Sequence, residues 1–425
     1  MTAIRPDQLD PATLWDALSA PQRTVLLLAA ASVAEAGGEA FLVGGPVRDV
    51  LRHDMRLHDI DIVTTTDARR VAQHFAIIAK AVVAKTTGFG TATVRIPDNG
   101  MSVDFATART ETYPHPGALP VVIFPASINE DLHRRDVTVN AMALPITPHG
   151  FGALLDPTGG LTDLRAGTIR VLHDATFRDD PTRLYRAVRY AARFGFTVEP
   201  HTAALLRTAV AEGALRTISP DRKRHELDLG IREADPVACF AAFDTCGLLR
   251  ATSPVLIWDD WIATRMPLVA PTAWPVWAFF VCRQDDAALA RLLADIPVGR
   301  THARISMLIH VWRSRGVIAH ASRLSEVAAL LDNLSERVVR ALLDGDPAAT
   351  RAALFYERLH HIRRQDLNWG HSFGNYLKAL GITPGPAYGE ILRALRNARL
   401  DGDVETQADA YAFVRTHLSE RDSAR

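Results

Sequence analysis

Two aspartates one residue apart, Asp59 and Asp61, stand in an otherwise apolar stretch that reads Asp-Ile-Asp-Ile-Val. In a β-strand successive side chains point to opposite faces, so the two carboxylates would share one face while Ile60 and Ile62 pack on the other. Adjacent carboxylates repel each other unless a cation lies between them, and Mg²⁺ is commonly held by one or two carboxylates together with substrate phosphates. The pair therefore predicts metal-dependent chemistry on phosphate groups. A strand that carries two solvated aspartates is the alternative interpretation, because the motif is short.

A third carboxylate, Asp104, alternates with apolar neighbours in the sequence Ser-Val-Asp-Phe-Ala, which also predicts a strand. If that strand lies beside the first, three carboxylates surround one point. Such a cluster is typical of a two-metal site for in-line displacement at phosphorus, where one metal activates the attacking hydroxyl and the other stabilises the departing phosphates. A lone exposed acid on a strand is the alternative.

A glycine pair, Gly44 and Gly45, follows the apolar run at residues 40–43 and comes before the aspartates. Pro46 is well tolerated at the first position of a helix, so the stretch predicts a strand, a turn and a helix. Glycines let backbone amides approach an anion, and Arg48 in the first helical turn can pair with phosphate oxygens. A Rossmann fold is disfavoured because no Gly-x-Gly-x-x-Gly is present. Taken alone, the glycine pair is also consistent with an ordinary turn.

Four arginines at helical spacing form the most regular pattern in the chain. They follow Asp180, a natural helix N-cap, and Pro181 at the first helical position. At about 100° per residue the four side chains fall within a stripe roughly 120° wide, with apolar residues on the other side. Four guanidinium groups on one face repel one another unless acids or an anion offset them, and a solvated basic face is the usual alternative. The four residues are Arg183, Arg186, Arg189 and Arg193.

Length and composition bound the class of protein. The 425 residues predict about two to four units, at roughly 100–200 residues per domain. The formal net charge is zero, so a nucleic-acid partner would be held by local basic patches. Three cysteines form neither a metal-ligand spacing nor an even disulfide set, which favours a reducing compartment. No signal peptide or membrane-spanning segment is apparent, and we expect a cytoplasmic protein.

The order of predicted elements indicates a mixed α+β head followed by helices. One mixed sheet with flanking helices accounts for the N-terminal order. A segment rich in Pro and Gly at residues 111–120 predicts a loop, and the pattern is helical from residue 164 onward. We expect a mixed α+β head at 1–165, a helical neck at 166–235, and a helical body and tail at 236–425. Strands are expected at 40–43, 59–63, 81–85, 91–96 and 102–106, and helices at 13–36, 46–52, 67–75, 181–194, 201–212, 221–231 and 236–246.

Six motifs follow one another in a fixed order along the first half of the chain. They are Leu-Val-Gly-Gly-x-Val-Arg-Asp, Asp-x-Asp, Val-Asp-Phe-Ala-Thr-Ala-Arg-Thr-Glu, Arg-Arg-Asp-x-Thr-x-Asn-Ala-Met-Ala, Asp-Pro-x-Gly-Gly-Leu-x-Asp-Leu and Asp-Asp-Pro-x-Arg. A seventh, at residues 218–227, contains Arg222 and Glu226. Together the motifs closely resemble class II tRNA nucleotidyltransferases, the CCA-adding enzymes and their bacterial poly(A) polymerase relatives, within the DNA polymerase β superfamily. Two departures are Asp179, where the family often has glutamate, and Tyr190, where it often has phenylalanine.

The resemblance implies an enzyme that adds nucleotides from CTP and ATP to the 3′ end of tRNA, with Mg²⁺ as cofactor. It also implies that the head is catalytic, that the neck recognises the nucleotide base, and that the body and tail bind tRNA. No obligate protein partner is evident from the sequence. Three other specificities exist within the family: addition of A alone, addition of CC alone, and poly(A) synthesis. The loop at residues 111–120 has ordinary length, which favours CCA addition because a shortened loop is associated with CC-adding members. A catalytically silent RNA-binding protein on the same scaffold is the alternative from another class.

The resemblance also implies a role for each motif residue. Asp59 and Asp61 would bind Mg²⁺, and Asp104 would be the third acid of the catalytic site. The nucleotide would be held at its triphosphate by Gly44, Gly45 and Arg48, near its sugar and phosphates by Arg135, Asp136 and Asn140, and at its base by Asp180 and Arg183, with Arg186 and Arg189 completing the pocket.

The chemistry of Asp180 and Arg183 agrees with a choice of cytosine and adenine. Each of these bases presents an exocyclic amine beside a ring-nitrogen acceptor, so a carboxylate can accept from the amine and a guanidinium can donate to the nitrogen. Uracil and guanine reverse both groups. The same pair of side chains would therefore reject them.

Overall fold

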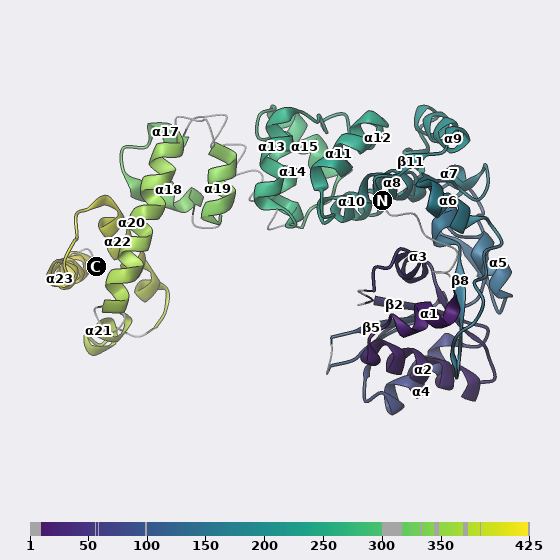
Figure 1. Ribbon diagram of the computed structural model, residues 1–425. Coiled ribbons are helices and arrows are strands. Elements are labelled where there is room, and N and C mark those ends of the chain that lie inside the picture. Colours follow the sequence, from purple (N-terminus) through teal and green to yellow (C-terminus); the bar gives the residue numbers. More distant parts are fainter. Residues whose placement is uncertain are drawn as a thin grey trace. The chain divides into compact units, whose positions relative to one another are not determined.

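The structure, a computed structural model, describes residues 10–55, 57, 59–97, 100–299, 317–331, 334–343, 348–368, 373–382 and 384–423 of the chain. The chain divides into two compact units, Met1–Thr252 and Ser253–Arg425. Every strand among the described residues lies in the first unit, and the described part of the second unit contains helices (Figure 1). The expected mixed α+β class is confirmed. The division into head, neck and body stays a prediction.

A seven-stranded mixed sheet forms the core of the first unit, as predicted. Its strand order is β3-β4-β5-β2-β1-β8-β9. β2 and β5 run parallel, and the other neighbouring strands are antiparallel. The strands are β1 (Ala40–Val43), β2 (Asp59–Thr64), β3 (Val82–Thr87), β4 (Thr91–Arg95), β5 (Ser102–Thr107), β8 (Ala143–Thr147) and β9 (Gly150–Phe151).

The two central strands, β2 and β5, alternate between apolar and polar side chains as predicted. Ile60, Ile62 and Phe105 are almost completely buried. Phe105 packs edge-on against Phe75 of α4 (Ala68–Ile78), with 5.3 Å between the ring centroids. Because side chains alternate along a strand, packing the apolar ones on the α4 side turns the carboxylates of β2 and β5 to the opposite face.

The prediction of a single helix at residues 13–36 is wrong, because this segment forms two helices. They are α1 (Pro11–Asp16) and α2 (Ala20–Glu35). Ser19 starts α2 with a capping box: its hydroxyl accepts from the backbone N–H of Gln22, and the Gln22 side chain accepts from the backbone N–H of Ser19 at 2.9 Å. A reciprocal cap of this kind begins a new helix within an otherwise apolar run.

The loop expected at residues 111–120 is shorter in the structure. β6 (Thr110–Thr112) and β7 (Val121–Ile123) form an antiparallel hairpin, so the connecting loop is residues 113–120. Thr and Val at paired positions favour strand pairing, which the Pro and Gly content of the segment obscured.

The helical pattern expected from residue 164 onward is interrupted twice. β10 (Thr168–Ile169) and β11 (Thr197–Val198) pair in parallel. The described helical segments that surround them in the first unit are α3 (Gly45–Leu51), α5 (Ile128–His133), η2 (Thr138–Asn140), α6 (Gly160–Ala166), α7 (Thr176–Asp179), α8 (Thr182–Phe194), α9 (Pro200–Ala211), η3 (Ala214–Thr217), α10 (Pro220–Ile231), α11 (Pro236–Thr245) and α12 (Leu248–Thr252).

The second unit is built from helices that bury large apolar side chains such as Trp277, Phe279 and Phe355. α22 begins at Pro386, at the break predicted from its Gly and Pro content. Among the described residues we find no helix with the length and apolar character needed to cross a membrane. The helices are α13 (Asp260–Val269), α14 (Ala273–Val281), α15 (Asp286–Asp295), α17 (Val317–His320), α18 (Leu324–Leu331), α19 (Glu336–Leu343), α20 (Ala348–Asn368), α21 (Phe373–Ala379), α22 (Pro386–Asp401) and α23 (Gln407–Ser423).

Candidate active site

A cavity of about 800 Å³ in the first unit brings together motifs that are far apart in the sequence. It is lined by the glycine turn, by the Asp-x-Asp strand, by the segment around η2 and by the arginine face of α8. The predicted site residues that line it are Gly44, Gly45, Arg48, Asp59, Asp61, Arg135, Asp136, Asn140, Asp180, Arg183, Arg186 and Arg189. Asp104 is the one predicted site residue that does not line this cavity.

The three predicted acids lie on adjacent parallel strands. Asp61 and Asp104 are directly paired in the register of β2 and β5, so their side chains share a face of the sheet. Asp104 accepts a hydrogen bond from the hydroxyl of Thr93 on the next strand, β4. Burial, the charge of Asp104 and, more weakly, that of Asp59 raise the pKa of Asp61 to about 6, against the opposing effect of nearby arginines. A cation beside Asp61 would offset this cost.

The donor set fits a hard divalent cation that completes its ligands with substrate oxygens. Asp59 and Asp61 are close in space and both line the cavity. Among the described residues no group of three or more His, Cys, Asp or Glu side chains is arranged to hold a metal ion by itself. Asp104 lies beside Asp61 in the register of β2 and β5, its charge acts on the Asp61 carboxyl, and its Oδ1 accepts from the Thr93 hydroxyl. Its role as the third acid stays a prediction. One or two carboxylates with phosphate oxygens and water remain a normal set for Mg²⁺.

The glycine turn packs closely against the neighbouring motif. Gly44 has φ +70°, and a Cβ on it would lie 3.0 Å from Nη1 of Arg135. Arg48 is 3% exposed, donates to the side-chain oxygen of Asn140 and lies over the ring of Phe194 at 4.4 Å. The turn and the segment around η2 therefore form one wall of the cavity.

Asp136 fixes the opposite end of that wall to α8. Its Oδ2 accepts from Nε of Arg186 at 2.8 Å, and its Oδ1 accepts from the N–H of Val137 and from the Asn140 amide. Burial would raise the pKa of Asp136, but the Arg186 charge and the hydrogen bonds outweigh it and lower the pKa to about 2. Asp136 is thus held ionised in a nearly buried position.

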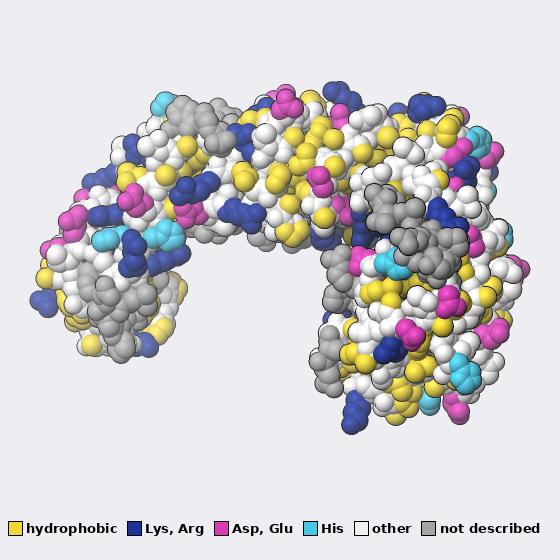
Figure 2. Space-filling model, viewed as in Figure 1, with side chains coloured by type: hydrophobic (Ala, Val, Ile, Leu, Met, Phe, Trp, Pro, Cys, Tyr) yellow, Lys and Arg dark blue, Asp and Glu magenta, His cyan; other side chains and the backbone are white. Residues whose placement is uncertain are grey.

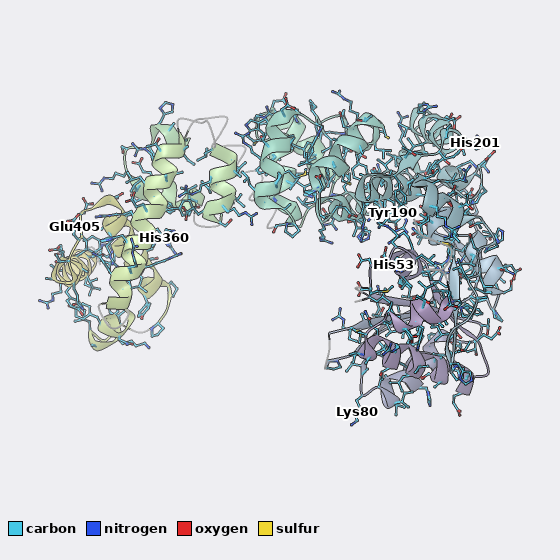
Figure 3. All side chains as sticks on the ribbon, viewed as in Figure 1. His53, Lys80, Tyr190, His201, His360 and Glu405 are labelled. Atoms are coloured by element: carbon cyan, nitrogen blue, oxygen red, sulfur yellow. The ribbon has the colours of Figure 1, made fainter. Side chains whose placement is uncertain are left out.

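Acidic side chains lie beside the arginine stripe of α8 and reduce the repulsion between its guanidinium groups. Arg189 pairs with Glu233 at 2.9 Å and with Glu226 at 3.7 Å. Arg193 lies 3.6 Å from Glu233. Tyr190 lies on the side of α8 that faces the glycine-turn helix (Figure 3) and packs between the guanidinium groups of the stripe. Three of the four arginines therefore have acidic partners, whereas Arg183 donates to neutral oxygens, and all four line the cavity.

The two residues expected to read the base already have protein partners. Arg183 donates from Nη1 to the Thr176 hydroxyl and from Nη2 to the Tyr113 hydroxyl and to the carbonyl of Arg134. The prediction that Asp180 is the N-cap of α8 is wrong, because α8 begins at Thr182 and Pro181 occupies the N-cap position. Asp180 lies one residue further back, and its Oδ1 accepts from the N–H of Thr182 at 3.1 Å. Both side chains line the cavity.

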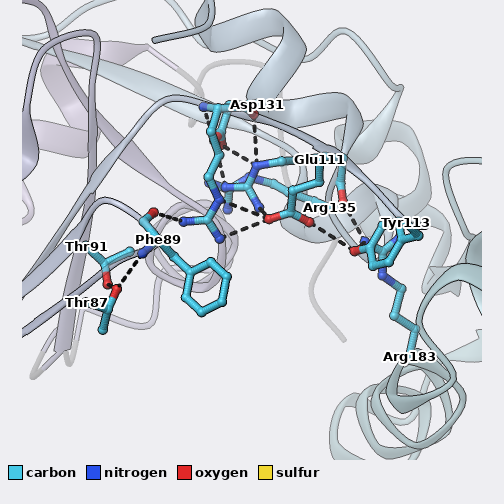
Figure 4. A network of polar contacts seen from close by, with 10 residues as sticks. Thr87, Phe89, Thr91, Glu111, Tyr113, Asp131, Arg135 and Arg183 are labelled. Atoms are coloured by element: carbon cyan, nitrogen blue, oxygen red, sulfur yellow. Dashed lines mark hydrogen bonds and ion pairs between the residues drawn. The ribbon is translucent and has the colours of Figure 1, made fainter. Parts of the chain in front are cut away.

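Sequence reasoning missed several residues that line the cavity. A network of ion pairs on the hairpin side joins Glu111 to Arg109 and Arg134, and Asp131 to Arg134 and Arg135 (Figure 4). Tyr113 extends this network to Arg183, and burial, together with the nearby Glu111, raises the pKa of its hydroxyl to about 12 against the effect of Arg183. The motif Thr-Ala-Arg-Thr-Glu contains Arg109 and Glu111 and is the sequence pattern from which their place in the site could have been predicted. The residues that line the cavity and that the sequence analysis did not assign to the site include Arg109, Glu111, Tyr113, Arg134, Tyr190, Arg193 and Arg222.

A strand with paired aspartates beside an arginine-lined cavity of about 800 Å³ is the architecture of a nucleotidyltransferase. The model of the poly(A) polymerase head domain matches residues 40–170. The A-adding tRNA nucleotidyltransferase of Halalkalibacterium halodurans is 32% identical over 90% of this chain and 89% of its own length. The A-adding enzyme of Geobacter sulfurreducens is also 32% identical, over 87% of this chain. The chain belongs to the family of tRNA nucleotidyltransferases and poly(A) polymerases, which are enzymes.

The length and the specificity of the relatives vary. The chain spans 44% of the Geobacter relative's length. The CCA-adding enzyme of Lactiplantibacillus plantarum is 30% identical over 89% of this chain and 92% of its own length. Among solved structures, a CCA-adding enzyme in an apo form is 27% identical with a TM-score of 0.72, covering 98% of this chain and 100% of that one. The Thermotoga maritima CCA-adding enzyme complexed with tRNA has 26% identity and a TM-score of 0.66, with the same coverage.

Proposed function

We propose that this protein transfers nucleotides from CTP and ATP to the 3′ end of tRNA and thereby builds the CCA terminus. The observation that carries the proposal is the single cavity that joins the Asp59 and Asp61 strand to the arginine face of α8. The names of the relatives, and the solved complex of one of them with tRNA, support the nucleic-acid substrate. The second, helical unit supplies a surface for the tRNA.

The proposed reaction is an in-line displacement without a covalent enzyme intermediate. The 3′-hydroxyl of the tRNA loses its proton to solvent and attacks the α-phosphorus of the nucleotide. The new phosphodiester bond forms, and the bond from the α-phosphorus to the bridging oxygen breaks so that pyrophosphate leaves. Asp59 and Asp61 would hold Mg²⁺, with Asp104 as the third acid of the site. In the proposed two-metal mechanism the metal would supply positive charge that stabilises the reacting phosphate and the departing pyrophosphate.

The side chains around the cavity bind and orient the nucleotide. Gly44, Gly45 and Arg48 contact the triphosphate. Its negative charge is further balanced by the guanidinium groups of α8 that are only partly offset by acids. Arg135, Asp136 and Asn140 form the wall beside the sugar and phosphates.

Selection of the base is assigned to Asp180, just before α8, and to Arg183 in its first turn. Asp180 accepts from the exocyclic amine of cytosine or adenine, and Arg183 donates to the adjacent ring nitrogen. Arg186 and Arg189 complete this part of the pocket. Because uracil and guanine reverse donor and acceptor, each would leave two buried polar groups unpaired.

A single assay tests the function. The full chain is incubated with Mg²⁺ and radiolabelled CTP or ATP, and with tRNAs that end at the discriminator base, at C or at CC. CCA addition predicts incorporation of C on the first two tRNAs and of A on the third. Long A tracts on any end would indicate poly(A) synthesis. Binding of tRNA without incorporation of either nucleotide would refute the proposal and leave a silent RNA-binding protein.

Addition of A alone is the second candidate. It is favoured because the two relatives at 32% identity are both named A-adding enzymes. In the same assay it predicts incorporation of A on the tRNA that ends in CC and no incorporation of C on either shorter tRNA. The ordinary length of the loop before β7 favours the full CCA reaction over addition of CC alone.

A further inference from the structure

Arg222 of α10 joins two parts of the cavity wall that are far apart in the sequence. Its Nη2 donates to Oδ1 of Asp180 at 2.7 Å, and its Nη1 donates to the carbonyl oxygen of Gly117 at 2.7 Å. About a quarter of its side chain is exposed, at the cavity. Both of its terminal nitrogens are therefore committed to fixed acceptors, one of which is a residue assigned to base selection.

The two oxygens of the Asp180 carboxylate have different surroundings. Oδ1 accepts from the N–H of Thr182 at 3.1 Å, from the Thr182 hydroxyl at 2.7 Å and from Arg222. A carboxylate oxygen has two lone pairs, so these three donors saturate Oδ1. Within the part of the chain that the structure describes, Oδ2 takes no hydrogen bond. Oδ2 is therefore the oxygen available to a ligand in the cavity.

The second acceptor of Arg222 is fixed by backbone packing. Gly117 has φ +72°, and its N–H donates to the carbonyls of Arg178 and Asp179 at 3.2 and 3.3 Å. A Cβ at Gly117 would lie 2.2 Å from the Thr217 hydroxyl. These contacts restrain the backbone at Gly117. Because the Gly117 carbonyl oxygen accepts from Nη1 of Arg222, it also restrains the orientation of the guanidinium group.

We propose that Arg222 is a positioning residue for base selection, which orients the Asp180 carboxylate so that Oδ2 faces the exocyclic amine of the incoming base. The terminal torsion of an aspartate is broad, so the carboxylate needs a partner to keep one oxygen directed at the ligand. The Thr182 donors hold one side of Oδ1, and Arg222 holds the other from a different helix. The inference rests on the proposed function, since it assigns a role within nucleotide selection.

The test compares the specificity of Arg222→Gln and Arg222→Lys with that of the wild type. Values of kcat/KM are measured for CTP, ATP, UTP and GTP on a tRNA end that the wild type extends. We expect Arg222→Gln to lower the preference for CTP over UTP by about ten- to hundredfold, as for loss of one charged hydrogen bond. Arg222→Lys should lower it less, because an ammonium keeps the charge beside Asp180 but cannot hold both acceptors.

Arg232→Gln is the matched control. Arg232 is an exposed arginine at the C-terminal end of the same helix, and its substitution should change neither the preference nor the melting temperature. The ratio of kcat/KM for CTP to kcat/KM for UTP is compared because a general loss of folded protein lowers both values together and leaves their ratio unchanged.

Three outcomes decide the inference. A folded, active Arg222→Gln enzyme with the wild-type preference overturns it. If the Gln variant does not fold, the Lys variant carries the same test, and an unchanged preference there overturns the inference equally. A wild-type protein that incorporates no nucleotide refutes the proposed function itself, whereas an active wild type with insensitive variants refutes only the role of Arg222.

Discussion

Arg186 of α8 and Asp136, fifty positions earlier in the chain, are joined by a charged hydrogen bond and an ion pair. Nε of Arg186 donates to Oδ2 of Asp136 at 2.8 Å, and Nη2 of Arg186 lies 2.6 Å from the same oxygen. This ion pair connects the segment that carries Asn140 to the helix that carries Arg183. The geometry of the cavity wall therefore depends on it, and such a contact is strong because both partners are ionised.

Substitution of Asp136 by Asn should destabilise the protein in a pH-dependent manner. The pKa of Asp136 is lowered to about 2, so its carboxylate stabilises the native state fully above about pH 5, and this contribution is lost as the pH falls toward 2. We expect a loss of about 2 kcal/mol in the free energy of unfolding at pH 7. Urea denaturation of both proteins at pH 7, 5 and 3 measures it. An equal difference in the free energy of unfolding between the two proteins at all three pH values would contradict the lowered pKa of Asp136.

Substitution of Asp61 by Asn should separate stability from activity. Burial and the charge of Asp104 raise the pKa of Asp61, so the ionised carboxylate destabilises the native state at pH 7.5 when no metal is bound. With EDTA present, the Asn variant should therefore be as stable as the wild type or more stable by about 1–2 kcal/mol. The same variant should incorporate no nucleotide with Mg²⁺. An active Asp61→Asn protein would exclude the proposed mechanism.

Substitution of Gly160 by Ala should disturb the cavity from a distance. A Cβ there would lie 2.2 Å from the carbonyl oxygen of Thr138, in the short helix η2 that contains Asn140. We expect a loss of about 1–3 kcal/mol in stability and a raised KM for both nucleotides, because Asn140 would shift. Gly88→Ala is the control, since no atom lies within 4 Å of a Cβ at Gly88. Equal behaviour of the two variants would contradict this explanation.

Arginines of the second unit should contribute to tRNA binding through phosphate contacts. On the face drawn in Figure 2, Lys and Arg side chains lie on both units. Arg363 and Arg364 of α20 are exposed. Replacing both with Ala should weaken tRNA binding and reduce the slope of log K against log salt by about 1–2. Filter binding between 50 and 300 mM KCl measures the slope.

The control for this prediction is Arg340→Ala. Arg340 is an exposed arginine of the same unit whose charge is already paired with Glu336 at 2.6 Å. It should leave the slope unchanged. If the double variant of α20 also binds with the wild-type slope, the tRNA does not contact that helix.

The local elements of the site could be predicted from the sequence because their causes are local. Alternation of aspartate and isoleucine at residues 59–62 forces the two carboxylates onto one face of a strand, whatever surrounds it. The spacing of the α8 arginines puts them on one side of a helix in the same way. The capping box at Ser19 was local too, and it was missed because the apolar run around it masked the boundary.

Only the tertiary structure decided which of these faces meet. The sequence by itself determined that Asp59 and Asp61 point together, that the α8 arginines form a stripe, and to which family the motifs are similar. It did not determine that Asp104 is paired in register with Asp61 yet turned to Thr93, or that Arg222 holds Asp180. Those contacts join segments tens of residues apart, and they depend on how the strands and helices pack, which no local spacing encodes.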